Sequence, residues 1–378
     1  IDEEIQEIDA DLGEKTNMTL ERILTPEEIS QQVDDIFFNE PSPNVYLDKL
    51  SKLIMHTSPY EKSSEAFLEK LNKISNQQEF EMIKLHQKNE NVIYKPFNQV
   101  ENDIHIPKKE LETDIPGGGD FITINPENNI FAVGDTLGHD KSVFKTFLYN
   151  FIKKLTNSSE TSDISIENLM KKFEIFWSQN EISQTIAKNK LSLSSAKNRS
   201  LSSLAICQKG KDMEGSFVKY VSFSDINMFS RDGDTGKVRH HQVKKDDKLS
   251  HLPVGLLKFI DIKEKREEIL LKNIKSEKIY LKENDNIFLF TDGLTETFLS
   301  NESMLQKILE KIITEDSHKP GSLRNRLAQK IRLAKQTNFF SDFTEKNTHL
   351  NNTNFIHKLK ETINTLPEKQ DDISGVMI

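Results

Sequence analysis

Apolar positions in the first part of the chain recur at the spacing of helices. Thr25-Pro26-Glu27-Glu28 is typical of a helix start, with Thr as N-cap, Pro at the first position and Glu at the third. The apolar residues that follow at helical spacing are Ile29, Val33, Ile36 and Phe37. After Glu40-Pro41-Ser42-Pro43, further stripes begin at Tyr46 and Phe67. We therefore expect a helical segment over 1–95, either a bundle or helical lead-in, or a regulatory segment that dimerises.

From residue 96 onward, short β-type runs alternate loosely with helical stripes. The expected strands are 121–124, 130–133, 203–207, 218–223, 287–290 and 373–378. The helical stripes surround Phe147 and Phe173, and a hairpin is expected at Arg231-Asp232-Gly233-Asp234. Loose alternation favours an α+β fold over a doubly wound parallel sheet. We expect a second domain over 96–378, with polar surface loops or insertions near 155–165 and 340–365.

Composition excludes several classes of protein. Of the 378 residues, 35% are hydrophobic, which is enough for a sizeable core. The net charge of −9, with no long basic run, argues against nucleic acid as a partner. The single cysteine, Cys207, excludes a disulfide framework and lies in an apolar run typical of core. The chain shows no signal-peptide pattern, and its apolar runs are too short for a membrane helix, so we expect a cytoplasmic protein without membrane contact.

Aspartates stand at the tips of several apolar runs, usually beside glycine. They are Asp120, Asp135, Asp292 and the pair Asp371 and Asp372. Carboxylates gathered from strand ends repel one another unless cations neutralise them. Hard oxygen ligands suit Mg²⁺ or Mn²⁺, and two such ions about 3.5–4 Å apart can activate water and clamp a phosphoryl group. Each aspartate alone reads as a turn or cap residue, whereas the set favours a metal site.

Five motifs occur in one order. They are Gly-Gly-Asp-Phe at 118–121, Gly-Asp-Thr-Leu-Gly-His at 134–139, Leu-Pro-Val-Gly-Leu at 252–256, Thr-Asp-Gly-Leu-Thr-Glu at 291–296 and Asp-Asp-Ile-Ser at 371–374. Over about 100–378 the chain resembles the metal-dependent protein phosphatases of the protein phosphatase 2C (PPM) superfamily. It resembles most closely their bacterial SpoIIE and RsbU branch, and the segment 282–296 is the most specific match.

The resemblance implies a fold and a metal site. The fold would be a sandwich of two antiparallel β-sheets flanked by helices, with two Mn²⁺ or Mg²⁺ ions at one edge. Asp135 resembles the aspartate that bridges both metals, with the Thr136 carbonyl as a further ligand. Asp292 and Asp371 resemble the other ligands of the first metal, with Asp371 preferred over its neighbour, and Asp120 resembles the carboxylate at the second.

Some positions depart from the family or leave alternatives open. Asp225 and Glu296 resemble a weak third metal site, although a polar strand-end residue is the simpler interpretation of Asp225. The family commonly has His-Gly where this chain has His139-Asp140, and His139 is expected to be structural. Residues 101–119 contain no arginine to hold phosphate, as in the bacterial branch. Beyond the hairpin, His240-His241 is expected to be exposed to solvent.

The resemblance implies a phosphatase acting on phosphoserine or phosphothreonine. A metal-activated water would attack phosphorus with Asp135 and Asp292 in the catalytic centre, and no covalent intermediate is expected. The implied partner is a phosphorylated anti-anti-sigma-type regulator in a bacterial partner-switching pathway, with the helices before residue 96 as a control or homodimerising element. The alternatives are a degenerate phosphatase fold that binds a partner protein, and a secreted effector phosphatase.

Overall fold

The computed structural model describes residues 23–57, 60–95, 118–136, 143–157, 165–179, 201–224, 226–235, 238–241, 253–256, 274, 276–293, 352–364 and 373–378. Its helices are α2 (Pro26–Asp34), the π-helical turn η1 (Asp35–Asn39), α3 (Pro43–Thr57), α4 (Glu61–Lys88), α5 (Val143–Asn157), α6 (Ile166–Gln179) and α13 (Asn352–Asn364). Its strands are β1 (Val92–Lys95), β2 (Asp120–Asn125), β3 (Ile130–Thr136), β4 (Ser202–Asp212), β5 (Gly215–Phe223), β6 (Asn227–Arg231), β7 (Val238–His241), β8 (Glu277–Leu281), β9 (Asn286–Phe290) and β10 (Ile373–Met377).

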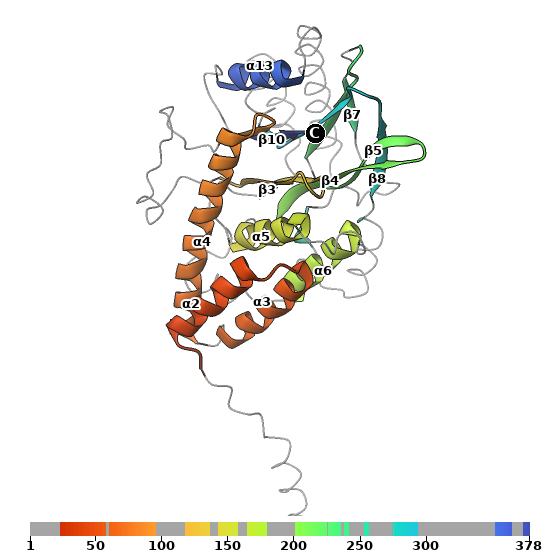
Figure 1. The fold of residues 1–378 in the computed structure, drawn as a ribbon. Helices are drawn as coiled ribbons and strands as arrows, with labels where there is room; N and C mark the ends of the chain where they lie inside the picture. Colours follow the sequence, from red (N-terminus) through yellow and green to blue (C-terminus); the bar gives the residue numbers. More distant parts are fainter. Residues whose placement is uncertain are drawn as a thin grey trace, which may run out of the picture.

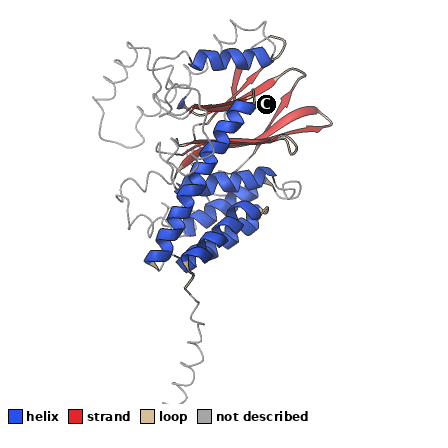
Figure 2. Cartoon of the chain, turned by 60° about the vertical axis from the view of Figure 1, so that its left-hand side comes forward, coloured by secondary structure: helices blue, strands red, loops and turns tan. Residues whose placement is uncertain are grey.

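The strands form two five-stranded sheets, in the orders β1-β10-β9-β6-β7 and β2-β3-β4-β5-β8. Every strand pair within them is antiparallel. Figure 1 shows α13 outside the first sheet, and α5, α6, α2 and α3 beyond the second. Turned by 60°, the same two sheets lie stacked between these helices (Figure 2). The expected α+β sandwich of two antiparallel sheets flanked by helices is thus confirmed.

Strand β9 is apolar from Ile287 to Phe290. All five of its residues are buried, because the sheet is covered on both faces. Ile287 and Leu289 belong to the large core between the sheets, whereas Phe288 and Phe290 belong to the smaller cluster beneath α13. The ring of Phe288 lies 5.5 Å from that of Phe355 in α13. Helix α13 therefore seals the outer face of the first sheet.

The helices before β1 pack on the helical side of the sandwich. Thr25 caps α2 through a reciprocal capping box with Glu28, as the sequence predicted. Tyr46 of α3 is fully buried, and its ring packs against Phe37 at 5.5 Å between centroids. Phe37 in turn lies 6.0 Å from Phe147 of α5. The described helices α2 to α4 thus share one hydrophobic cluster with α5, α6 and the space between the sheets.

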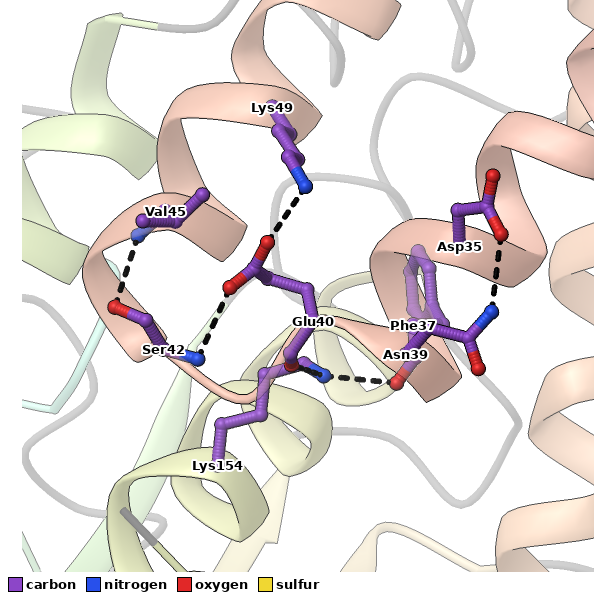
Figure 3. Close-up of polar contacts among 8 residues, drawn as sticks. All are labelled: Asp35, Phe37, Asn39, Glu40, Ser42, Val45, Lys49 and Lys154. Carbon is purple, nitrogen blue, oxygen red and sulfur yellow. Dashed lines mark hydrogen bonds and ion pairs between the residues drawn. The ribbon is translucent and has the colours of Figure 1, made fainter. Parts of the chain in front are cut away.

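A lysine from α5 reinforces this packing (Figure 3). Lys154 is buried, and its ammonium group donates hydrogen bonds to the backbone carbonyls of Phe37, at 2.9 Å, and Glu40. These carbonyls lie at the end of η1, where helix acceptors lack partners within the helix. Burial lowers the pKa of Lys154 from its ordinary 10.5 to about 8.

The structure also departs from the sequence-based expectations. The polar region near 340–365 was expected to be surface loop or insertion, but residues 352–364 form α13 and bury Phe355, Ile356 and Leu359. His241 was expected to be exposed, but it is half-buried in β7, with its Nε2 atom 2.6 Å from Ser230 Oγ. The hairpin expected at Arg231-Asp232-Gly233-Asp234 agrees with the antiparallel pairing of β6 with β7. Among the described helices, none has the length and apolar character needed to cross a membrane.

Candidate active site

Asp120 and Asp135 face each other across neighbouring strands. They are register partners at the start of β2 and near the end of β3. In the next pair, the Thr136 N–H donates to the Gly119 carbonyl at 3.0 Å. Because hydrogen-bonded and non-hydrogen-bonded pairs alternate in antiparallel sheets, Asp120 and Asp135 form a non-hydrogen-bonded pair, the type in which opposing Cα atoms are about 4.5 Å apart. Their side chains therefore leave the sheet on the same face, close together.

A threonine from the other sheet ties Asp120 in place. Thr291, directly after β9, is fully buried, and its hydroxyl donates to Asp120 Oδ2 at 2.8 Å. The same hydroxyl accepts the Ser374 N–H at 3.0 Å, and the Thr291 N–H donates to the Ser374 carbonyl at 3.0 Å. Thr291 thus joins β2 of one sheet to β9 and β10 of the other.

This contact also places Asp292, the residue after Thr291. It lies half-buried at the carboxyl end of β9, next to the amino end of the antiparallel strand β10. The structure therefore brings Asp120, Asp135 and Asp292 to the same end of the sandwich. The other candidates lie outside the described residues: Asp371, Asp372, Asp225, Glu296, His139 and Asp140.

The glycine before Asp135 has a packing reason. Gly134 is the register partner of Phe121, and a β-carbon at Gly134 would lie 2.2 Å from Phe121 Cζ. No side chain is tolerated there without displacing the ring. Phe121 itself packs on Tyr149 of α5, with 5.9 Å between ring centroids. Gly134, which precedes Asp135, and Phe121, which follows Asp120, are therefore in contact with each other beside the carboxylates.

The backbone of Asp135 is held from the opposite side. Its carbonyl accepts a hydrogen bond from Ser202 Oγ at 2.8 Å, and Ser202 forms an isolated β-bridge with Val254. The following residue, Gly255, has a φ of 91° and donates its N–H to the buried Glu174 of α6 at 2.6 Å. A positive φ of this kind favours glycine. The described part of the Leu-Pro-Val-Gly-Leu motif, residues 253–256, thus lies beside β4, next to Asp135.

The donor chemistry of this cluster suits a hard cation. Asp120 is 1% exposed, and side-by-side carboxylates in such a place repel unless a cation or a proton lies between them. Oxygen donors of this kind fit Mg²⁺ or Mn²⁺. The described residues contain no group of three or more acidic, histidine or cysteine side chains that could hold a metal ion.

Sequence reasoning missed several residues of this site. Thr291 is part of the Thr-Asp-Gly motif. Its position as a polar residue between a buried strand and an aspartate was the one sequence signal for its role in holding the site together. Ser202 and Glu174 carried no such signal, because their roles depend on contacts between residues far apart in the sequence.

Comparisons with known proteins were made for the whole chain. No protein-family profile and no curated protein matches it. Among solved structures, RsbU and RsbW domains of a Mycobacterium tuberculosis protein match 70% of this chain and 57% of that one, at 11% identity and a TM-score of 0.39. The PP2C phosphatase domain of SpoIIE from Bacillus subtilis, with a fragment of its regulatory domain, matches 76% of this chain and 61% of that one, at 13% identity and a TM-score of 0.39.

The SiaA-PP2C domain of Pseudomonas aeruginosa matches 84% of this chain and 99% of that one, at 11% identity and a TM-score of 0.35. The chain thus spans less than two thirds of the length of the first two structures. These structures include phosphatase domains of the SpoIIE and RsbU branch of the PP2C superfamily. The resemblance read from the sequence is therefore confirmed as a structural similarity.

Proposed function

We propose that the protein is a metal-dependent phosphatase that hydrolyses phosphoserine or phosphothreonine in proteins. One observation supports this proposal: Asp120 and Asp135 lie opposite each other on neighbouring strands of one sheet, and Asp292 follows the end of β9 in the other sheet, at the same end of the sandwich. A purely structural role would not favour gathering carboxylates at the ends of buried strands, since they repel each other.

In this proposal Asp135 would help to hold both Mn²⁺ or Mg²⁺ ions, the Thr136 carbonyl, Asp292 and Asp371 would contribute to one of them, and Asp120 would contribute to the other. Bound ions of this kind lower the pKa of water and stabilise charge on a phosphoryl group. Other residues of the chain would hold the carboxylates in position. Thr291 orients Asp120 through its hydroxyl, and Ser202 fixes the Asp135 backbone. Asp225 and Glu296 are candidates for a third, weaker ion.

The substrate we propose is a small phosphorylated regulator of the anti-anti-sigma type, in a cytoplasmic partner-switching pathway. The helices before residue 96 would then act as a control or homodimerising element. Their packing supports this, because they contact α5 and α5 contacts β2, which begins with Asp120. This assignment of substrate and control rests on the sequence resemblance.

The experiment is hydrolysis of p-nitrophenyl phosphate and of a phosphoserine peptide with Mn²⁺, Mg²⁺ or EDTA. We compare wild type, Asp292→Asn and a control, Asp234→Asn, whose aspartate is exposed in the hairpin after β6. We expect metal-dependent turnover in wild type and in the control, and a loss of at least about 100-fold in Asp292→Asn, as for removal of a group that stabilises charge in the transition state.

The outcomes separate this enzyme from the alternative of a partner-binding scaffold. Absence of turnover with every metal, together with no Mn²⁺ binding in calorimetry, would refute the phosphatase and favour the scaffold. Turnover that survives in Asp292→Asn would refute the placement of the site at the end of β9.

A further inference from the structure

A cluster of buried ionic and polar groups lies between the helices and the start of β2. Lys145 of α5 forms an ion pair with Glu79 of α4 and donates a hydrogen bond to the Gly118 carbonyl. Tyr94 of β1 donates its hydroxyl to the other carboxylate oxygen of Glu79. The exposed fractions of Glu79, Lys145 and Tyr94 are 0%, 1% and 2%, so the cluster is closed to solvent.

Stability alone is a weak explanation for this cluster. Taking two charges out of water costs several kcal/mol per ion, and well-packed apolar side chains often stabilise a core as well or better. The surrounding core is already rich in apolar contacts, such as the buried Phe144 and Phe147 on the same helix. What the ammonium group supplies, and an apolar side chain cannot, is a directed hydrogen bond to the Gly118 carbonyl.

A hydrogen bond to the Gly118 carbonyl bears directly on the backbone that leads into Asp120. It precedes Asp120 by two residues in the run Gly117-Gly118-Gly119. Glycine leaves the backbone conformation open, so the path into β2 depends on contacts made from outside. Lys145 holds the backbone before Asp120, and Thr291 holds the carboxylate itself.

We propose that Lys145 and Glu79 are positioning residues for Asp120, so that loss of this buried pair weakens Mn²⁺ binding at the site. This rests on the proposed function, because Asp120 is taken as a metal ligand. Glu79 orients the ammonium group, Tyr94 orients Glu79, and the ammonium group fixes the Gly118 carbonyl.

The chain offers a matched control between the same two helices. Lys153 of α5 pairs with Glu81 of α4, but their side chains are 40% and 35% exposed. This pair makes no hydrogen bond to Gly118 among those described. Loss of Lys153 therefore reports the effect of weakening the contact between α4 and α5 without disturbing the approach to Asp120.

The test uses the full chain and measures the Mn²⁺ concentration for half-maximal hydrolysis of p-nitrophenyl phosphate, Mn²⁺ binding by calorimetry, and the urea unfolding midpoint. The main variant replaces the whole cluster with apolar side chains, as Glu79→Leu with Tyr94→Phe and Lys145→Met. We expect a near-wild-type unfolding midpoint, a half-activating Mn²⁺ concentration raised about 10-fold, and a kcat at saturating Mn²⁺ close to wild type. Lys153→Met should leave the Mn²⁺ dependence unchanged.

Several results would overturn the proposal. The first is an Mn²⁺ dependence within twofold of wild type in a folded triple variant. The second is an equal change in Lys153→Met, which would indicate a general effect of helix packing. If the triple variant does not fold, Glu79→Gln replaces it, and a half-activating Mn²⁺ concentration equal to wild type is then the overturning result. A wild-type chain without metal-dependent turnover would instead refute the proposed function, and this inference with it.

Discussion

Replacing Thr291 by valine tests whether one hydroxyl joins the two sheets at the carboxylates. Valine keeps the shape of the side chain, which is fully buried, and removes only its hydrogen-bonding group. The change deletes the bond to Asp120 Oδ2, worth about 1.5–3 kcal/mol for a charged acceptor. It also leaves the Ser374 N–H without its acceptor in a buried place, at a cost of about 1–3 kcal/mol. Partial relaxation of the backbone should bring the total to about 3 kcal/mol.

Thr291→Ser is the matched control, because it keeps the hydroxyl and loses one methyl group, worth about 1 kcal/mol. Urea unfolding in EDTA gives the free energy of unfolding for wild type and both variants. A second measurement, the Mn²⁺ concentration for half-maximal activity, should rise about 10-fold or more in Thr291→Val only, since the group that orients Asp120 is lost. If valine and serine variants unfold with the same free energy, the link between the sheets through this hydroxyl is refuted.

Two further predictions concern packing and charge. Gly134→Ala should lower the free energy of unfolding by about 1–3 kcal/mol in urea denaturation, since the new methyl group collides with the ring of Phe121, and an unchanged midpoint would contradict that contact. The pKa of Lys154 is about 8 in the folded protein against its ordinary 10.5. Unfolding between pH 8 and pH 10.5 therefore takes up a proton, and the free energy of unfolding should rise with pH through this range. The difference in free energy of unfolding between wild type and Lys154→Met should therefore shift in favour of wild type by about 1–2 kcal/mol from pH 7.5 to pH 10. A pH-independent difference would argue against the lowered pKa.

The sequence predicted the elements whose patterns are local. Strand β9 reads as an apolar run because both of its faces are covered, and α2 begins where its capping box and proline indicate. The aspartates at strand tips were visible for the same reason. Each is defined by the run that it ends or begins.

The elements that were missed depend on distant contacts or on sparse apolar residues. Strand β1 has only four residues and is fixed by pairing with β10. Helix α13 buries three apolar residues in a polar stretch, so its composition resembled a loop. Lys145 and Glu79 are separated by 66 positions, and no pattern in either neighbourhood indicates that they meet.

The place of β10 in the first sheet has a consequence for biosynthesis. It lies between β1 and β9, and it is translated after every other described element. Until β10 has been made, β1 lacks its described neighbour in the sheet, and Thr291 lacks the Ser374 N–H and carbonyl that hold it against Asp120. Pairings between such distant segments form late and slowly. The contact between Thr291 and Asp120 should therefore be completed only after β10 has emerged from the ribosome, well after β2 and β3 have brought Asp120 and Asp135 together.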